Sequence, residues 1–244
     1  MKNKPTVLFQ NDSILAIDKP AGLLSVPDRY KEDKPSMANL LLEEYPTARP
    51  LHRLDFETSG ILLFCLLPEA FGWYSDQFEH RVITKKYEVI AEGRCIDKEG
   101  LIDAPLFTQN IGKVVISKRG KPSQTSWQLL EGFQHHAYIE ANPHTGRTHQ
   151  IRVHLASIGH PIVGDVLYGS GGPLYLSSLK GKKRYRLSKD VEEERPMLNR
   201  LALHASSITF KDFRSGDEIR VESPLPKDML VAIAKLRQYS SLVK

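Results

Sequence analysis

The chain has 244 residues, of which 41% are hydrophobic and 26% are charged, an ordinary composition for a globular protein with a sizeable core. Its longest uninterrupted apolar run, residues 61–67, is too short for a membrane span, and its first residues lack the apolar core of a signal peptide. These features argue against a membrane protein and predict a cytoplasmic one, while the formal net charge of +5 favours an acidic partner such as nucleic acid.

The first third of the chain predicts two strands and two helices. A strand over residues 14–20 (ILAIDKP) is expected to end at Pro20, because proline lacks the donor that a strand ladder needs. Ser36 can cap a short helix over residues 37–44. The polar stretch LHRLDFETSG (residues 51–60) precedes a buried strand, ILLFCLL, and a helix is expected from Pro68 to about His80.

The middle of the chain is rich in predicted strands, and helices follow. Strands are expected over residues 85–93, 114–118, 125–131 and 138–141. A helix over residues 148–157 has Thr148 as its expected cap and Gly159 as its stop. Strands over residues 201–210 and 219–222 precede a final helix after Pro226. The whole predicts one α+β domain over residues 1–244, with a mixed, largely antiparallel sheet and flanking helices.

A metal site is not expected from the histidines of this chain. His144, His149 and His154 are each five residues apart, which on a helix turns successive side chains by about 140°. That spacing suits capping and packing better than shared ligation of one ion. Cys65 and Cys95 lack the paired spacing of a zinc or redox motif and are expected to be buried and reduced.

Charged residues next to apolar runs are the candidates for chemistry. His52, Arg53, Asp55 and Glu57 border the apolar strand, where desolvation of a charge is costly, although a solvated loop is the ordinary explanation. Arg152 adjoins the apolar stripe of the predicted helix over residues 148–157. A guanidinium at such an edge needs an anionic partner, and Asp55 is a candidate.

Three segments in order, HRLDFETSG (52–60), KKYEVIAEG (85–93) and GRTHQIRVHLASIGHPIVGDVLYG (146–169), resemble the RluA-type family of RNA pseudouridine synthases. The resemblance runs from IDKPAGLLSVP (17–27) through LHASSITF (203–210). It implies a fold with a central RNA-binding cleft and the isomerisation of uridine to pseudouridine, with no cofactor and no metal. The expected protein is a cytoplasmic monomer that binds RNA.

The resemblance also assigns roles to single residues. It implies that Asp55 is the catalytic nucleophile or base, that Tyr87 stacks on the uracil, and that Arg152 pairs with Asp55. It suggests that Arg53 holds the flipped nucleotide or the RNA around it, and His52 is a second candidate for this contact. Leu203 belongs to the segment that forms part of the family's apolar pocket wall, although core packing alone would explain it.

Two departures from the family pattern stand out. Cys65-Leu66 replaces the small residue and lysine that usually end the strand after TSG, which puts a basic RNA contact there in doubt. The catalytic motifs also begin near the first residue, so the S4-type RNA-binding domain of many relatives is expected to be absent.

The basic segment of residues 174–190 has two interpretations. It is either a solvated loop or a hairpin around Gly181 that clamps RNA phosphates through Lys182, Lys183 and Arg184. For the chain as a whole, a catalytically inactive RNA-binding relative and a base-releasing hydrolase are the rival functions. The stretch SVPDRYKEDKPSM (residues 25–37) looks most like members that act on large-subunit ribosomal RNA, so 23S rRNA is the expected target and tRNA the alternative.

Overall fold

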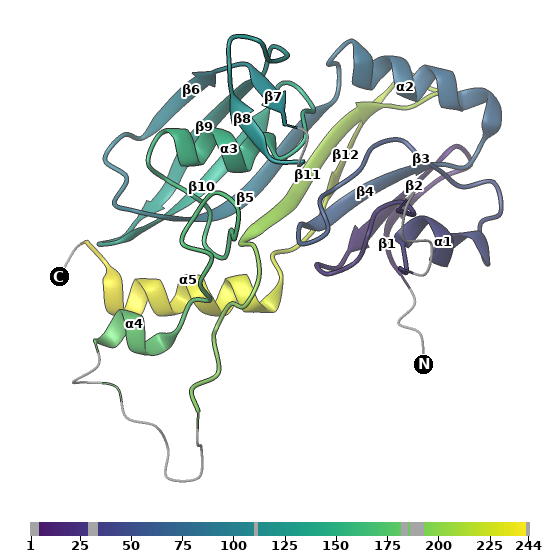
Figure 1. Ribbon diagram of the computed structural model, residues 1–244. Helices are drawn as coiled ribbons and strands as arrows, with labels where there is room; N and C mark the ends of the chain where they lie inside the picture. The colour runs from purple at the N-terminus through teal and green to yellow at the C-terminus, as the bar shows by residue number, and fades with distance from the viewer. Residues whose placement is uncertain (1–4, 29–33, 110–111, 182–184, 186–192, 243–244) are drawn as a thin grey trace. The chain divides into compact units, whose positions relative to one another are not determined.

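The computed structural model describes residues 5–28, 34–109, 112–181, 185 and 193–242. The chain forms two compact units: residues 1–87 with 204–224, and residues 88–203 with 225–244 (Figure 1). The strands β5 (Thr84–Glu92) and β11 (Leu203–Lys211) contribute residues to both units. The single domain expected over residues 1–244 stays a prediction.

The sheet of the first unit is mixed. Its strand order is β1 (Thr6–Gln10), β2 (Ile14–Lys19), β4 (Ser59–Cys65) and β11, while β3 (Arg49–Pro50) also pairs with β4 and β12 (Glu218–Glu222) with β11. The β4–β11 pair is parallel, whereas the pairs β1–β2, β2–β4, β3–β4 and β11–β12 are antiparallel. This confirms the α+β class with a largely antiparallel sheet.

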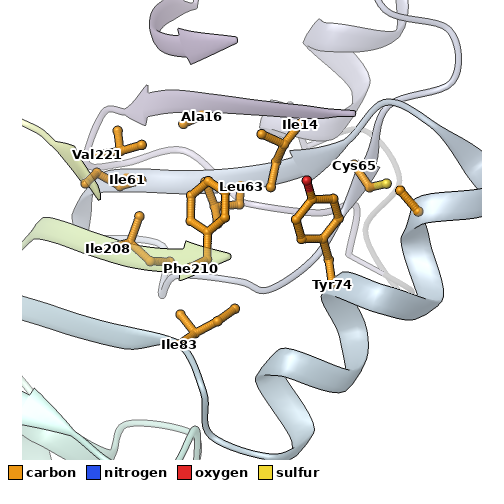
Figure 2. Close-up of a cluster of buried hydrophobic side chains, with 11 residues drawn as sticks. Ile14, Ala16, Ile61, Leu63, Cys65, Tyr74, Ile83, Ile208, Phe210 and Val221 are labelled. Carbon is orange, nitrogen blue, oxygen red and sulfur yellow. The ribbon is translucent and has the colours of Figure 1, made fainter. Parts of the chain in front are cut away.

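Strand β4 is buried on both faces, which explains its uninterrupted apolar sequence. Ile61 and Leu63 pack into a cluster with Tyr74 of α2 (Phe71–Glu79), as Figure 2 shows. The intervening Leu62 packs into a second cluster, which also contains Met37 of α1 (Met37–Leu42). The alternating side chains of one strand therefore serve two cores.

Gly60 allows β4 to pair closely with β11. A Cβ atom on Gly60 would lie 2.3 Å from the Ala205 carbonyl oxygen, and the backbone has a φ of +110°. Only glycine tolerates both conditions. Beside this contact, the buried Ser59 hydroxyl and His204 Nδ1 are hydrogen-bonded at 3.0 Å. The end of the LHRLDFETSG stretch is thus built into the sheet.

The strands of the second unit follow the order β5, β10 (His136–Pro143), β9 (Gln124–Gly132) and β6 (Glu99–Asp103). β9 is antiparallel to both β10 and β6. The helix α3 (Gln150–Ser157) packs on these strands (Figure 1), and β7 (Leu106–Thr108) pairs with β8 (Val114–Ile116). The short helix α4 (Leu176–Lys180) contacts α5 (Lys227–Ser240).

Most predicted elements are confirmed within a few residues, and Ser36 caps α1 as expected. The helix expected from Pro68 begins as the short 3-10 helix η1 (Pro68–Ala70) before α2. The Thr148 cap was wrong: α3 begins at Gln150, and His149 precedes it in the left-handed conformation without a side-chain cap. The strands β1 and β6 were missed because they are edge strands with mostly exposed residues.

A hairpin around Gly181 was one of two interpretations of this segment, and the residues before Gly181 do not form one of its strands. Residues 176–180 form the helix α4, and Gly181 ends it with a φ of +77°. Lys182, Lys183 and Arg184 lie outside the described residues. Within the part of the chain that the structure describes, no helix is both long enough and apolar enough to cross a membrane.

Candidate active site

Asp55 lies in the loop formed by residues 51–58, between β3 and β4. On one side of it, the buried Ser25 hydroxyl accepts the Leu54 N–H at 2.9 Å and donates to the Leu54 carbonyl oxygen at 2.8 Å. On the other side, the Thr58 N–H donates to the Asp55 carbonyl oxygen at 3.1 Å and closes a turn. The half-buried Asp55 side chain therefore extends from a backbone that is held before and after it.

Lys19, at the end of β2, holds the residue that follows Asp55. Its side chain is fully buried, where an ammonium group without partners would be very unfavourable. It donates to three backbone carbonyl oxygens, those of Pro20 (2.9 Å), Leu23 (2.7 Å) and Phe56 (3.3 Å). The sequence reasoning missed this role, although a lysine inside the apolar run ILAIDKP was a signal for it.

His52 holds the start of the same loop. The Leu63 N–H in β4 donates to His52 Nε2 at 3.1 Å, and the Leu51 N–H donates to the Leu63 carbonyl oxygen at 3.0 Å. Burial, with the charge of Lys85 as a second cause, lowers the pKa of His52 to about 3. The ring is therefore neutral near pH 7, as an accepting Nε2 requires. The structure gives His52 a positioning role, and its expected contact with RNA stays a prediction.

We expect His52 to destabilise the protein in acid. Its pKa of about 3 in the folded protein lies below the ordinary 6.5, so the unfolded chain binds the proton first as the pH falls. The stability that neutral His52 contributes is complete above about pH 6.5 and is lost as the pH falls from there to about 3.

Urea unfolding of His52→Gln tests this expectation, because glutamine keeps an acceptor for the Leu63 N–H but does not titrate. The free energy of unfolding of the wild type should fall more steeply below pH 6.5, by up to about 1.4 kcal/mol per pH unit. His136, whose pKa burial lowers to about 4, titrates in both proteins and cancels in the comparison. Equal slopes would contradict the assignment.

Tyr87 and Asp55 interact electrostatically within the first unit. The half-buried Tyr87 ring packs against the cluster that includes Leu54 and Ala205. Burial, and then the negative charge of Asp55, raise the pKa of the Tyr87 phenol above its usual value. The phenol is therefore protonated at neutral pH. The structure thus brings together two of the three residues to which the sequence assigned catalysis.

Lys85 is a further charged group of this site. It lies two residues before Tyr87, so both side chains leave the same face of β5. Burial lowers the pKa of its ammonium group to about 8, and its charge acts on His52. The sequence reasoning did not select Lys85, although it stands in the KKY segment that was used to find Tyr87.

The remaining predicted residues of the first motif and of β11 differ in exposure. Arg53 is exposed, and it has no hydrogen-bond or ion-pair partner among the described residues. Its guanidinium is therefore accessible to an anion. Leu203, the first residue of β11, is buried, which core packing explains; its place in a pocket wall stays a prediction.

Arg152 forms a buried ion pair in the second unit. Its Nε and Nη2 atoms each donate to Asp165 at 2.8 Å, a bidentate geometry, and both side chains are almost completely buried. Burial alone would raise the pKa of Asp165, but hydrogen bonds and the charge of Arg152 outweigh it and lower the pKa below its usual value. The sequence reasoning required an anionic partner near Arg152 but missed Asp165. The expected pairing with Asp55 stays a prediction.

Tyr168 also contacts Arg152. The guanidinium carbon of Arg152 lies 5.2 Å from the centre of the Tyr168 ring, a cation–π distance. The Tyr168 hydroxyl accepts the Val114 N–H at 3.0 Å and is hydrogen-bonded to His149 Nδ1 at 2.9 Å. These contacts, together with Asp165, hold the guanidinium in one orientation.

The other two histidines of the evenly spaced set, His144 and His154, have separate partners. His144 Nε2 is hydrogen-bonded to the Ser126 hydroxyl at 3.0 Å. His154 lies between the Thr125 hydroxyl (2.8 Å) and the Ala104 carbonyl oxygen (3.0 Å). Hydrogen bonding and packing therefore account for both side chains, as expected from their spacing.

Comparisons with known proteins identify the family. The sequence model of the RNA pseudouridylate synthase family matches residues 13–157, more than half of the chain. The dual-specificity RNA pseudouridine synthase RluA of Escherichia coli O157:H7 is 35% identical over 222 residues, which cover 89% of this chain and 92% of that protein. The chain belongs to the RluA-type RNA pseudouridine synthases.

Two further proteins with pseudouridine synthase names are similar to this chain, one in sequence and one in structure. Ribosomal large subunit pseudouridine synthase D of Nitrosomonas europaea is 33% identical over 238 residues, which cover 95% of this synthase and 65% of that protein. The solved structure of human RNA pseudouridylate synthase domain containing 1 aligns with a TM-score of 0.67 at 25% identity, covering 91% and 84% of the two chains. The fold expected from the sequence is therefore confirmed.

The synthase differs from the usual pattern at the end of β4. The Cys65 thiol is buried and donates to the Leu67 carbonyl oxygen at 3.1 Å. Leu66, which stands where the pattern has lysine, packs against the cluster around Phe64. This position therefore contributes to packing and carries no charge for an RNA phosphate.

Proposed function

We propose that Asp55 is the carboxylate with which this synthase converts uridine to pseudouridine. The reaction breaks the N1–C1′ bond and forms a C5–C1′ bond, while a proton leaves C5 and N1 takes one up. The isomerisation is redox-neutral overall, so the chemistry requires no redox cofactor. A carboxylate can attack the sugar or remove one of its protons while the enclosed base stays bound.

The observation that supports this role most strongly is the fixed backbone around Asp55. Ser25 holds Leu54 before it, and Lys19 holds Phe56 after it. A reacting group must be kept close to its productive geometry, and the buried Ser25 and Lys19 side chains both form hydrogen bonds to this loop. An ordinary solvated loop would not need them.

Tyr87 and Arg152 are proposed as the partners of Asp55 in the reaction. The Tyr87 ring is suited to stack on the uracil. Its hydroxyl is protonated and can donate a hydrogen bond. Arg152 is proposed to keep Asp55 ionised, as a neighbouring cation does for a carboxylate. Arg53 is proposed to contact the RNA, because its guanidinium is exposed on the same loop as Asp55, residues 51–58.

We propose 23S rRNA as the target, with tRNA, or both RNAs, as the alternative. One relative is named for the large ribosomal subunit and another for dual specificity, which supports this choice. A compact stem-loop with an unpaired uridine is the proposed RNA structure, since such a base is easily extruded. The synthase is proposed to act as a monomer in the cytoplasm.

Transcriptome-wide pseudouridine mapping tests the target. Cells with and without the gene are compared, and the deletion strain is complemented with wild type or with Asp55→Asn. We expect one or more sites in 23S rRNA to disappear on deletion and to return only with the wild type. Loss confined to tRNA would contradict the ribosomal assignment, and no lost site would support an RNA-binding role without catalysis.

A further inference from the structure

Phe56, the residue after Asp55, exposes 47% of its surface. Leu54 and Thr58, two residues away on either side, are 7% and 2% exposed. A single exposed phenylalanine is common on protein surfaces. Here, however, the ring adjoins the proposed catalytic carboxylate of an enzyme that acts on RNA.

The backbone of Phe56 is as firmly held as that of Asp55. Its carbonyl oxygen accepts both the buried Lys19 ammonium group at 3.3 Å and the Gly22 N–H at 2.9 Å. The ring therefore extends from a fixed point, so little conformational entropy is lost when it contacts a ligand.

A cation lies close to the ring. The Lys34 ammonium group is 5.9 Å from the centre of the Phe56 ring, and both side chains are exposed. An aromatic ring beside a lysine is the combination with which proteins bind single-stranded RNA: the ring stacks on a base and the cation contacts the backbone.

We propose that Phe56 is the stacking platform for a nucleobase adjacent to the target uridine, and that Lys34 contacts the neighbouring phosphate. When the target uridine leaves its stack, the adjacent base loses a stacking partner. The Cα atoms of Asp55 and Phe56 are about 3.8 Å apart, so a ribose at Asp55 brings the next nucleotide within reach of the ring. The position relative to the target rests on the proposed role of Asp55.

Four variants at this position test the proposal: Phe56→Ala, Phe56→Leu, Phe56→Tyr and Phe56→Trp. Binding is measured with a synthetic stem-loop RNA that has a uridine in its loop, and turnover with total RNA from cells that lack the gene. The alanine and leucine variants should weaken binding and raise KM roughly 5- to 150-fold, with little change in kcat. The tyrosine and tryptophan variants should stay within about threefold of the wild type, because they keep a planar aromatic face.

Trp73→Ala is the matched control, because Trp73 is a 42% exposed aromatic residue on α2. It should leave KM unchanged. Wild-type KM and binding in Phe56→Ala or Phe56→Leu would overturn the proposal, and so would equal impairment of all four variants with a lowered melting temperature. If the wild type binds RNA but makes no pseudouridine, the proposed function fails, while the binding series still decides whether Phe56 stacks on RNA.

Discussion

Asp55→Asn should fold normally and make no detectable pseudouridine, with kcat reduced by at least about 10⁴-fold. Asparagine has nearly the same shape as aspartate, and the Asp55 side chain is only half-buried, so the Ser25 and Lys19 contacts with the loop backbone should persist. What the variant lacks is the negative charge and the nucleophilic oxygen. Single-turnover assays on RNA from the deletion strain measure the effect, and circular dichroism checks the fold.

Glu57→Gln is the matched control, since it removes a half-buried carboxylate from the same loop. It should keep turnover within a few-fold of the wild type. Mass spectrometry of the product separates two chemistries, because isomerisation leaves the RNA mass unchanged whereas release of uracil lowers it. Turnover of Asp55→Asn near that of the wild type would exclude the proposed role of this carboxylate.

Asp165→Ala should destabilise the protein by about 3–5 kcal/mol, because it leaves the buried Arg152 guanidinium without its bidentate partner. Asp228→Ala is the control. Its carboxylate also forms a bidentate pair, with Arg200, but the Asp228 side chain is 35% exposed, so water can replace the lost contact. We expect this control to cost about 1 kcal/mol or less.

The double variant Arg152→Met, Asp165→Leu separates stability from catalysis. Replacing both charges with apolar side chains should recover part of the stability that Asp165→Ala loses, because no buried charge is left unpaired, while the Leu167 and Tyr168 N–H groups still lack their acceptor on Asp165. Activity should remain low if Arg152 takes part in the reaction. Urea unfolding gives the free energies, and a loss in Asp165→Ala no larger than in Asp228→Ala would show that the buried pair contributes little.

The sequence by itself determined the class of fold and the chemistry-bearing motifs. The apolar residues that begin ILAIDKP and the apolar run ILLFCLL predict strands that the structure contains, because a short apolar run indicates a buried strand. The residues of the HRLDFETSG, KKY and HQIRVH segments likewise carry the family resemblance in their identities and order. Such local information does not depend on which segments meet in space.

Only the tertiary structure decided which side chains hold these motifs. Arg152 needed a carboxylate on energetic grounds, yet the choice of Asp165 depends on where the chain returns after α3. Lys19 and Ser25 act on a loop about thirty residues further along the chain, and His52 accepts a hydrogen bond from the middle of β4. Gly60 is required because β11, far away in sequence, packs against its Cα. Buried polar groups find their partners where distant segments meet. The spacing of apolar residues along the chain does not show which segments meet.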